Sequence, residues 1–407
     1  MLSSATALDT KADLRLWLTP DWTRPETWLG ALSRYVVHAP ALGSTCLCLE
    51  VGEAEHALAA DLAAVACETL AHDRAFAPVL LVVGDVDRRD SLRVDDGAGV
   101  LAALGVQAPP TPVHAEQIVA RARRGKLLAD ELLAIADHHL MTLGGDPWLE
   151  PEPLVTVPVP TWKGDEHLMQ RTLPSILQGT YRNVEVLVCS DGPDPVARAA
   201  VEALAGRDAR VRHLELLASP HRPSHPRSFW ETTGLHAANR ALEGARGRFI
   251  APLEHDDQFT STHVADLLAR ARQERADFVH AQALCEQRSG PPQLVGRERL
   301  TRGHVCSGAV LYSDRLAHMR YDTACWLLEE PGDWNMWRRM QEHGARIAFL
   351  DRVVLLHTAE RTIEERAGDG TTRFGAPRTA ADLASDVLGT DASWYLEVEP
   401  AAAEVCA

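Results

Sequence analysis

The sequence lacks several features that would place it in a broad functional class. No run approaches the ~18 consecutive apolar residues of a membrane span, and residues 1–5 lack the basic start of a secretion signal. No long basic run offsets the formal net charge of −16, which argues against a general binder of nucleic acids or anionic membranes. We therefore expect a cytoplasmic protein with no transmembrane segment and no nucleic-acid partner.

The eight cysteines do not show the CxxC spacing of a zinc or redox motif. Cys46 and Cys48 alternate within a strand-like run, where both side chains can face the core. Buried free thiols are therefore favoured over disulfides or a zinc site.

The first part of the chain alternates strand-like and helix-like segments, a pattern that predicts a parallel sheet covered by helices. The expected strands are 14–18, 45–51 and 78–83, and the expected helices are 24–37, 54–71 and 115–142, the last as one helix or a broken pair. This part has no Gly-rich phosphate loop and no tight acid–base cluster. We predict a smaller Rossmann-like α/β domain over 1–145, whose role is structural or in acceptor recognition.

The remaining boundaries follow from composition, because 407 residues with 46% apolar content suffice for two domains. Residues 146–153 contain three prolines and are predicted to be a linker. A second α/β domain is expected over 154–360, and a partly ordered C-terminal extension over 361–407.

The stretch Glu254-His255-Asp256-Asp257 follows the apolar run 247–253, which predicts a buried strand. Ligands of open α/β sheets bind at the carboxyl ends of strands. Adjacent carboxylates repel one another unless a positive group lies between them, most simply a divalent cation that bridges to phosphate. The alternative is a solvated acidic turn.

Other polar residues are predicted at neighbouring strand ends. Pro160, Trp162 and Asp191 end two strands of a βαβ unit, where a ring and a carboxylate can stack on a nucleobase and accept its N–H. The alternative to a nucleobase site is that Trp162 packs at the edge of the core and Asp191 lies in an ordinary turn. The loop 219–228 contains Arg222 and Arg227, which would neutralise a diphosphate beside it or otherwise be solvated.

Two further residues carry possible chemistry near the end of this domain. Asp333 is expected at the N-cap of a helix, where its carboxylate can still accept a proton from a hydroxyl. His357 ends the last predicted strand and is either structural or a metal ligand.

Together these segments resemble the family 2 glycosyltransferases, inverting enzymes with the GT-A nucleotide-diphospho-sugar transferase fold, over residues 154–358. The matching segments are the opening strand 157–162, the helix and Gln-x-Thr-Tyr turn at 173–181, the base-contacting segment 189–192, the DXD metal motif at 254–257 and the Glu-Asp motif at 332–334. The sequence departs from the family pattern at Ser190, at Glu254 and His255, and at Gly332, where the family usually has acidic residues.

The resemblance implies a mixed, mainly parallel sheet flanked by helices. It implies a hexosyltransferase that moves a sugar from a UDP-, GDP- or dTDP-sugar to a hydroxyl of a glycan, lipid-linked sugar or natural product, by a single inverting displacement. It assigns Asp333 as general base and Mn²⁺ or Mg²⁺ as cofactor, held by Asp256, Asp257 and His357. The implied donor-site residues are Pro160, Trp162, Asp191, Arg227, Glu254 and His255.

Two other functions stay open. The altered DXD motif would suit a non-catalytic nucleotide- or sugar-binding module, although retention of Asp333 favours catalysis. A sugar nucleotidyltransferase shares the fold but needs a Gly-rich loop with Arg and Lys after the first strand. That turn is Trp162-Lys163-Gly164-Asp165, which disfavours this alternative.

Overall fold

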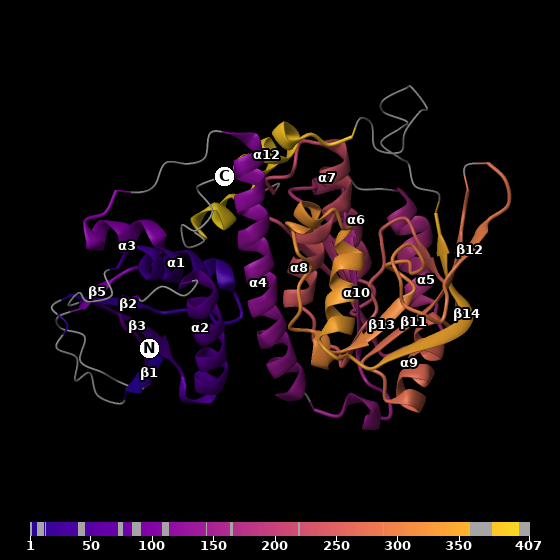
Figure 1. Cartoon of the computed structure of the whole chain (residues 1–407). Helices are drawn as coiled ribbons and strands as arrows, with labels where there is room; N and C mark the ends of the chain where they lie inside the picture. The colour runs from indigo at the N-terminus through magenta and orange to yellow at the C-terminus, as the bar shows by residue number, and fades with distance from the viewer. Residues whose placement is uncertain are drawn as a thin grey trace. The chain divides into compact units, whose positions relative to one another are not determined.

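The computed structural model describes most of the chain. The described residues are 2–5, 12, 14–39, 45–71, 76–83, 91–107, 114–143, 145–162, 166–218, 220–287, 289–358 and 377–398. They form two compact units, Met1–His139 with Arg378–Ala407, and Leu140–Pro377 (Figure 1). The turn at 163–165 and, of the expected extension, residues 361–376 and 399–407 lie outside the described residues.

The first unit contains a five-stranded sheet among its described residues, fully parallel, in the order β1-β4-β3-β2-β5. Its strands are β1 (Leu2–Ala5), β2 (Leu14–Leu18), β3 (Thr45–Val51), β4 (Val79–Val83) and β5 (Ser91–Arg93). The three predicted strands are confirmed as β2, β3 and β4. The two edge strands escaped prediction because three or four residues are too few to show a period.

The helices of this unit are α1 (Leu29–His38), α2 (His56–Ala71), α3 (Gly97–Leu104), α4 (Ala115–Leu143) and α12 (Ala380–Gly389). The segment that could have been two helices is thus the single helix α4. Cys46 and Cys48 are both buried, with their sulfurs 4.0 Å apart on one face of β3, as predicted from their spacing. All seven described cysteines are free thiols.

The second unit contains a nine-stranded mixed sheet among its described residues, in the order β10-β14-β11-β13-β9-β6-β7-β8, with β12 paired to β11. Its strands are β6 (Val155–Thr161), β7 (Val184–Ser190), β8 (Val211–Glu215), β9 (Phe249–Ile250), β10 (Gln258–Phe259), β11 (Phe278–Cys285), β12 (Gln293–Val295), β13 (Val310–Ser313) and β14 (Ile347–His357). The predicted mixed α/β sheet is confirmed.

Alternate residues of the central strands divide between two faces of this sheet. Val186 and Val188 join the core cluster that includes α9, whereas Leu187 and Cys189 pack against α8. The helices are α5 (Leu173–Leu177), α6 (Pro195–Ala205), α7 (Pro226–Glu231), α8 (Leu235–Glu243), α9 (His263–Glu274) and α10 (Gly332–Glu342). A π-helical turn, Leu168–Thr172, directly precedes α5.

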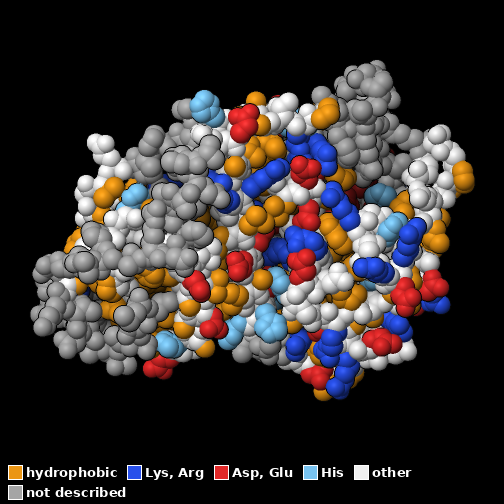
Figure 2. Space-filling view, in the orientation of Figure 1, with side chains coloured by type: hydrophobic (Ala, Val, Ile, Leu, Met, Phe, Trp, Pro, Cys, Tyr) orange, Lys and Arg blue, Asp and Glu red, His pale blue; other side chains and the backbone are white. Residues whose placement is uncertain are grey.

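The surface of the second unit is mixed in charge. On the face drawn in Figure 2, basic and acidic side chains lie interspersed. Within the described parts of the chain, no helix is both long enough and apolar enough to span a bilayer.

The segment expected to be a linker packs against the second unit through Trp148. This residue lies in a short 3-10 helix, Pro147–Leu149, and its indole N–H donates to the Ala276 carbonyl at 2.8 Å. The Arg346 guanidinium lies 4.4 Å from the centre of the Trp148 ring and also pairs with Asp277. A buried aromatic ring inside the proline-rich stretch therefore anchors it.

A buried carboxylate fastens the turn that enters β9. Glu185 on β7 is only 3% exposed and accepts hydrogen bonds from the Thr156 hydroxyl at 2.6 Å and the Arg246 backbone N–H at 2.7 Å. The Arg246 guanidinium donates to its other oxygen at 2.9 and 2.7 Å. Gly247 follows, where a Cβ would lie 2.5 Å from the Thr156 nitrogen, so only glycine fits without a shift. Burial would raise the pKa of Glu185, but these hydrogen bonds outweigh it and lower the pKa.

We expect Glu185→Ala to lower the free energy of unfolding by about 1–3 kcal/mol, because it removes several hydrogen bonds to one buried charge. The folded-state pKa lies below the unfolded value, so this contribution is present above the unfolded pKa and is lost as the pH falls through the folded pKa. Urea unfolding at pH 7 and below about pH 4 should therefore show a difference from wild type that shrinks in acid. Glu243→Ala, which removes an exposed partner of Arg240, is the matched control and should change stability by less than about 0.5 kcal/mol. An equal effect of the two variants would contradict the assigned role of Glu185.

Candidate active site

Several strands of the second unit, among them β6, β7, β9 and β14, end at the same edge of the sheet. β6 is parallel to both β7 and β9. β13 is antiparallel to β9 and to β11, so β11 and its parallel neighbour β14 run in the same direction as β6. The backbone N–H groups of Ala251 and Leu253 donate hydrogen bonds to carbonyls of β6, so the chain stays paired with β6 up to Glu254. Residues that follow these strands therefore meet, as the sequence predicted from strand ends.

A cavity of about 140 Å³ lies at this edge. It is lined by six of the predicted residues, namely Pro160, Trp162, Asp191, Glu254, His255 and Asp333. Other lining residues include Gly234, Leu235, Ser307 and Tyr321, which the sequence did not single out. A second hollow of about 460 Å³ shares Trp162 and Asp191 and is otherwise lined by residues 192–196.

The arginine at this site is Arg222, and not Arg227, which was predicted as the donor-site residue. Arg222 forms an ion pair with Asp191, which is 4% exposed, and its guanidinium carbon lies 5.7 Å from the centre of the Trp162 ring. Arg227 instead pairs with Glu231 at 3.2 Å and is not among the residues that line either hollow. The sequence predicted one loop for both arginines, so spacing alone could not tell which would reach the site; the structure places Arg227 in α7.

Ser190, which stands where the family usually has an acid, points away from the cavity. Its hydroxyl is buried and lies 2.9 Å from the His213 imidazole on the neighbouring strand β8. The carboxylate that lines the cavity from this segment is therefore Asp191.

Asp257 and His357 form an ion pair at the edge of the acidic stretch. The His357 Nδ1 lies 2.9 Å from one oxygen of Asp257, and the backbone N–H of Thr358 donates to the other at 2.9 Å. Burial alone would lower the pKa of His357, but the hydrogen bond and charge of Asp257 outweigh it and raise the pKa to about 10. The structure thus brings together two of the three predicted metal ligands as a charged pair.

Glu254 lies at the cavity, where the Ser307 hydroxyl donates to it at 2.5 Å. Its side chain is open to solvent but has protein on most sides. Limited solvation, together with the charges of Asp257 and Asp256, raises the pKa of the Glu254 carboxyl to about 8.

Asp256 is the carboxylate best placed to receive a cation. Its side chain has no hydrogen-bond or ion-pair partner among the residues that the structure describes, and only its backbone carbonyl is bonded, by the Thr358 hydroxyl at 2.6 Å. In the same described part of the chain, no three His, Cys, Asp or Glu side chains converge as a complete metal site. The oxygen donors fit Mg²⁺ or Mn²⁺ if a bound diphosphate supplies further ligands.

Asp333 lies in the first turn of α10, and the expectation that it caps this helix is wrong. The N-cap is Pro331, whose extended backbone ends the preceding loop, and Asp333 follows one residue after the helix start. One Asp333 oxygen accepts the Trp334 backbone N–H at 2.6 Å, and the residue lines the cavity. At Gly332 a Cβ would lie 2.4 Å from the Leu235 side chain, so the glutamate usual in the family would not fit without displacing it.

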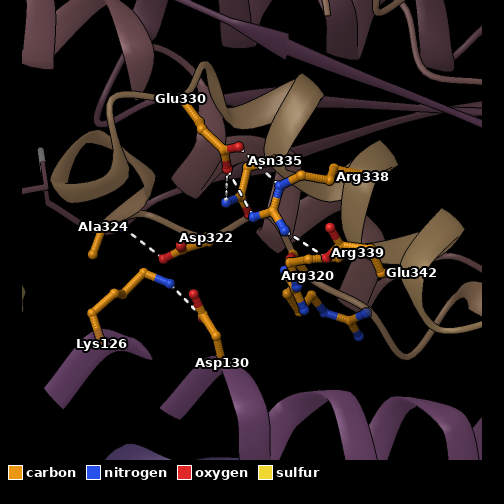
Figure 3. Close-up of polar contacts among 10 residues, drawn as sticks. All are labelled: Lys126, Asp130, Arg320, Asp322, Ala324, Glu330, Asn335, Arg338, Arg339 and Glu342. Atoms are coloured by element: carbon orange, nitrogen blue, oxygen red, sulfur yellow. Dashed lines mark hydrogen bonds and ion pairs between the residues drawn. The ribbon is translucent and has the colours of Figure 1, made fainter. Parts of the chain in front are cut away.

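A separate carboxylate, Glu330, holds the start of this helix (Figure 3). It accepts the side-chain amide of Asn335 at 2.8 Å and two guanidinium hydrogen bonds from Arg338 at 2.8 and 2.9 Å. Asn335 is fully buried. Glu330 therefore fixes the turn Pro331-Gly332 from which Asp333 enters the cavity.

The N-terminus of helix α8 adds positive electrostatic potential at the cavity. Thr233, Gly234 and Leu235 line it, and α8 begins at Leu235 after Gly234 adopts a left-handed φ of 76°. The first backbone N–H groups of a helix have no partner within the helix and favour a negative ligand.

Comparison with known proteins identifies related sequences over the second unit. A family model described as "Glycosyltransferase like family 2" matches residues 151–369, more than half of the chain. EpsJ of Bacillus subtilis (strain 168), named an uncharacterized glycosyltransferase, is 28% identical over 154 residues, covering 37% of this chain and 41% of EpsJ. WfgD of Escherichia coli, named a UDP-Glc:alpha-D-GlcNAc-diphosphoundecaprenol beta-1,3-glucosyltransferase, is 34% identical over 104 residues, covering 26% of this chain and 35% of WfgD. The chain thus spans less than half the length of these curated relatives.

Two solved structures are similar at low identity. S. aureus TarS 1-349 in complex with UDP-GlcNAc has 16% identity and a TM-score of 0.41, covering 58% of this chain and 67% of that chain. The mannosyltransferase PcManGT from Pyrobaculum calidifontis, in complex with GDP-Man and Mn²⁺, has 15% identity and a TM-score of 0.40, covering 70% of this chain and 84% of that chain.

We expect Glu330→Ala to lower the free energy of unfolding by about 1–3 kcal/mol, because it leaves the buried Asn335 amide without this acceptor. Glu342→Ala is the matched control, since Glu342 pairs with the same Arg338 but is largely exposed. Its effect should stay below about 0.5 kcal/mol. Thermal unfolding of the two variants beside wild type makes the comparison, and equal melting temperatures for both variants would rule out the role given to Glu330.

Proposed function

The chain belongs to the glycosyltransferase-like family 2, and from this membership we propose that it transfers a sugar from a nucleotide-diphosphate donor to a hydroxyl acceptor with inversion. The family membership confirms the resemblance found in the sequence over residues 154–358, and with it the GT-A fold class of the second unit. The donor, acceptor and mechanism that follow are proposals.

The observation that carries this proposal is the composition of one cavity. Trp162 and Asp191 line it from β6 and β7, Glu254 from the acidic stretch, and Asp333 from the start of α10. An aromatic ring with a carboxylate suits a nucleobase, and a carboxylate at a separate wall suits a base for an incoming hydroxyl. A site for nucleotide alone would not need the second carboxylate.

In the proposed reaction Asp333 accepts the proton of the acceptor hydroxyl as that oxygen attacks the anomeric carbon. The bond from this carbon to the diphosphate oxygen breaks on the opposite face, so the configuration inverts. Trp162 and Asp191, with Pro160 beside them, hold the nucleobase, and His255 and Glu254 line the path to the diphosphate. Arg222 binds one oxygen of Asp191, and the other oxygen, which has no hydrogen-bond partner among the described residues, accepts the base N–H. Arg227 remains a predicted phosphate contact that would first have to leave Glu231.

We propose that Mn²⁺ or Mg²⁺ assists this reaction, with Asp256, Asp257 and His357 as the ligand set. A divalent cation would stabilise the charge that develops on the leaving diphosphate. Asp256 is available as it stands, whereas Asp257 and His357 would have to give up their mutual ion pair.

The relatives suggest where to look for substrates. The names printed for WfgD and for the two solved complexes include UDP-Glc, UDP-GlcNAc and GDP-Man, and the WfgD acceptor is lipid-linked. We propose a UDP-, GDP- or dTDP-hexose as donor for this chain, and a glycan, lipid-linked sugar or natural product as acceptor. A non-catalytic binding module is the second candidate, because the described residues hold no complete metal cluster.

Calorimetric titration with UDP, GDP and dTDP, each with and without Mn²⁺, tests the donor site. One nucleotide should bind in a metal-dependent way, and Asp256→Asn should weaken that binding about tenfold or more because it removes a charged metal ligand. Asp351→Asn is the control, an exposed carboxylate on β14 bonded to Gln282, and should bind as wild type does. No binding by a folded wild-type protein would refute the donor site.

Asp333→Asn separates catalysis from binding. We expect turnover, measured as nucleoside diphosphate released from the nucleotide sugar, to fall about 100-fold or more, since the amide cannot accept the proton. Donor affinity should stay within about twofold of wild type, because the nucleobase and diphosphate contacts are elsewhere. Unchanged turnover would exclude Asp333 as the base, and binding without turnover in wild type would favour the non-catalytic module.

A further inference from the structure

Tyr321 lines the cavity beside the proposed reaction centre. It lies in the loop between β13 and α10 and is 7% exposed. Burial raises the pKa of Tyr321 well above its usual value, and the charges of Tyr312, Asp333 and Glu254 raise it further. The phenol therefore stays protonated at neutral pH and is available as a hydrogen-bond donor.

The backbone of Tyr321 is held rigidly. The Asn239 side chain on α8 brackets it, because its amide donates to the Tyr321 carbonyl and its oxygen accepts the Tyr321 N–H, each at 2.8 Å. The ring packs edge-on against Trp337 of α10, with centroids 6.1 Å apart. Contacts from two helices that line the cavity thus fix the direction of the side chain.

The Tyr321 hydroxyl is not used by the protein itself. None of the described residues forms a hydrogen bond with it, and the interactions of Tyr321 are those of its backbone and ring. Tyr312 in the same apolar cluster has a fully buried hydroxyl without a partner, whereas the Tyr321 hydroxyl keeps some exposure and its residue lines the cavity. A polar ligand in the cavity would supply the missing acceptor.

We propose that the Tyr321 hydroxyl donates a hydrogen bond to a ring hydroxyl of the donor hexose and so selects the sugar of the nucleotide donor. The inference rests on the proposed donor site. Trp162 and Asp191 would bind the nucleobase, whereas Tyr321 lies with Glu254 and Asp333 at the walls where diphosphate and acceptor would meet. The hexose joins those two groups, so its hydroxyls are the ligand atoms that lie between them.

A hydrogen bond from Tyr321 to the hexose should affect binding of the nucleotide sugar but not of the bare nucleoside diphosphate. Titration with matched pairs of these ligands tests this difference. UDP with UDP-glucose, GDP with GDP-mannose, and dTDP with dTDP-glucose are titrated into wild type and Tyr321→Phe in the presence of Mn²⁺. For the pair that wild type binds, Tyr321→Phe should weaken binding of the nucleotide sugar about tenfold, the loss expected for one buried hydrogen bond. Binding of the bare diphosphate should change less than twofold.

Tyr312→Phe is the matched control. Tyr312 is fully buried, packs on the same Trp337 at 5.9 Å, belongs to the same apolar cluster and does not line the cavity. It should bind both ligands as wild type does. Equal losses for both ligands, or no loss for either, in Tyr321→Phe would overturn the proposal. If wild type bound a diphosphate and Tyr321→Phe still bound the nucleotide sugar as wild type does, the proposed donor site would stand and only the role of Tyr321 would be refuted. If wild type bound neither the diphosphate nor the nucleotide sugar, the donor site and the role of Tyr321 would both be refuted.

Discussion

Parallel pairing of β6 with both β7 and β9 is the constraint on which the candidate site depends. Three strand ends that are far apart in sequence meet because these strands run in one direction and in register. The pairing of β9 is only two residues long, and its entry turn is held by Glu185 and by the close approach of Gly247 to Thr156. A buried charge on β7 thus helps to place the acidic stretch, although it does not line the cavity.

Electrostatic imbalance is the second property of this edge. Glu254 and Asp333 line the cavity, and limited solvation together with the charges of Asp257 and Asp256 raises the pKa of Glu254. His357 offsets part of the charge through Asp257, and Arg222 offsets that of Asp191. The remaining excess of negative charge is the condition that favours a divalent cation.

Helix α10 brings the remaining carboxylate to the cavity by packing and by hydrogen bonding. Gly332 lets the helix approach Leu235 so closely that a side chain there would collide, and Glu330 ties the preceding turn to Asn335 and Arg338. The departure from the family pattern at Gly332 therefore has a steric explanation. Glu330 lies two residues earlier and supplies a carboxylate that positions the helix instead.

The sequence by itself determined longer strands such as β2, β3 and β4 and the edge at which polar residues of the second unit gather, because strand periodicity and strand-end positions are local properties. Six of the predicted residues, including Trp162, Asp191 and Asp333, accordingly line one cavity. Only the tertiary structure decided that Arg222 and not Arg227 reaches Asp191, that Asp257 pairs with His357, and that Tyr321 joins the cavity. Those outcomes depend on side-chain directions and on contacts between segments up to about a hundred residues apart, which no local pattern specifies.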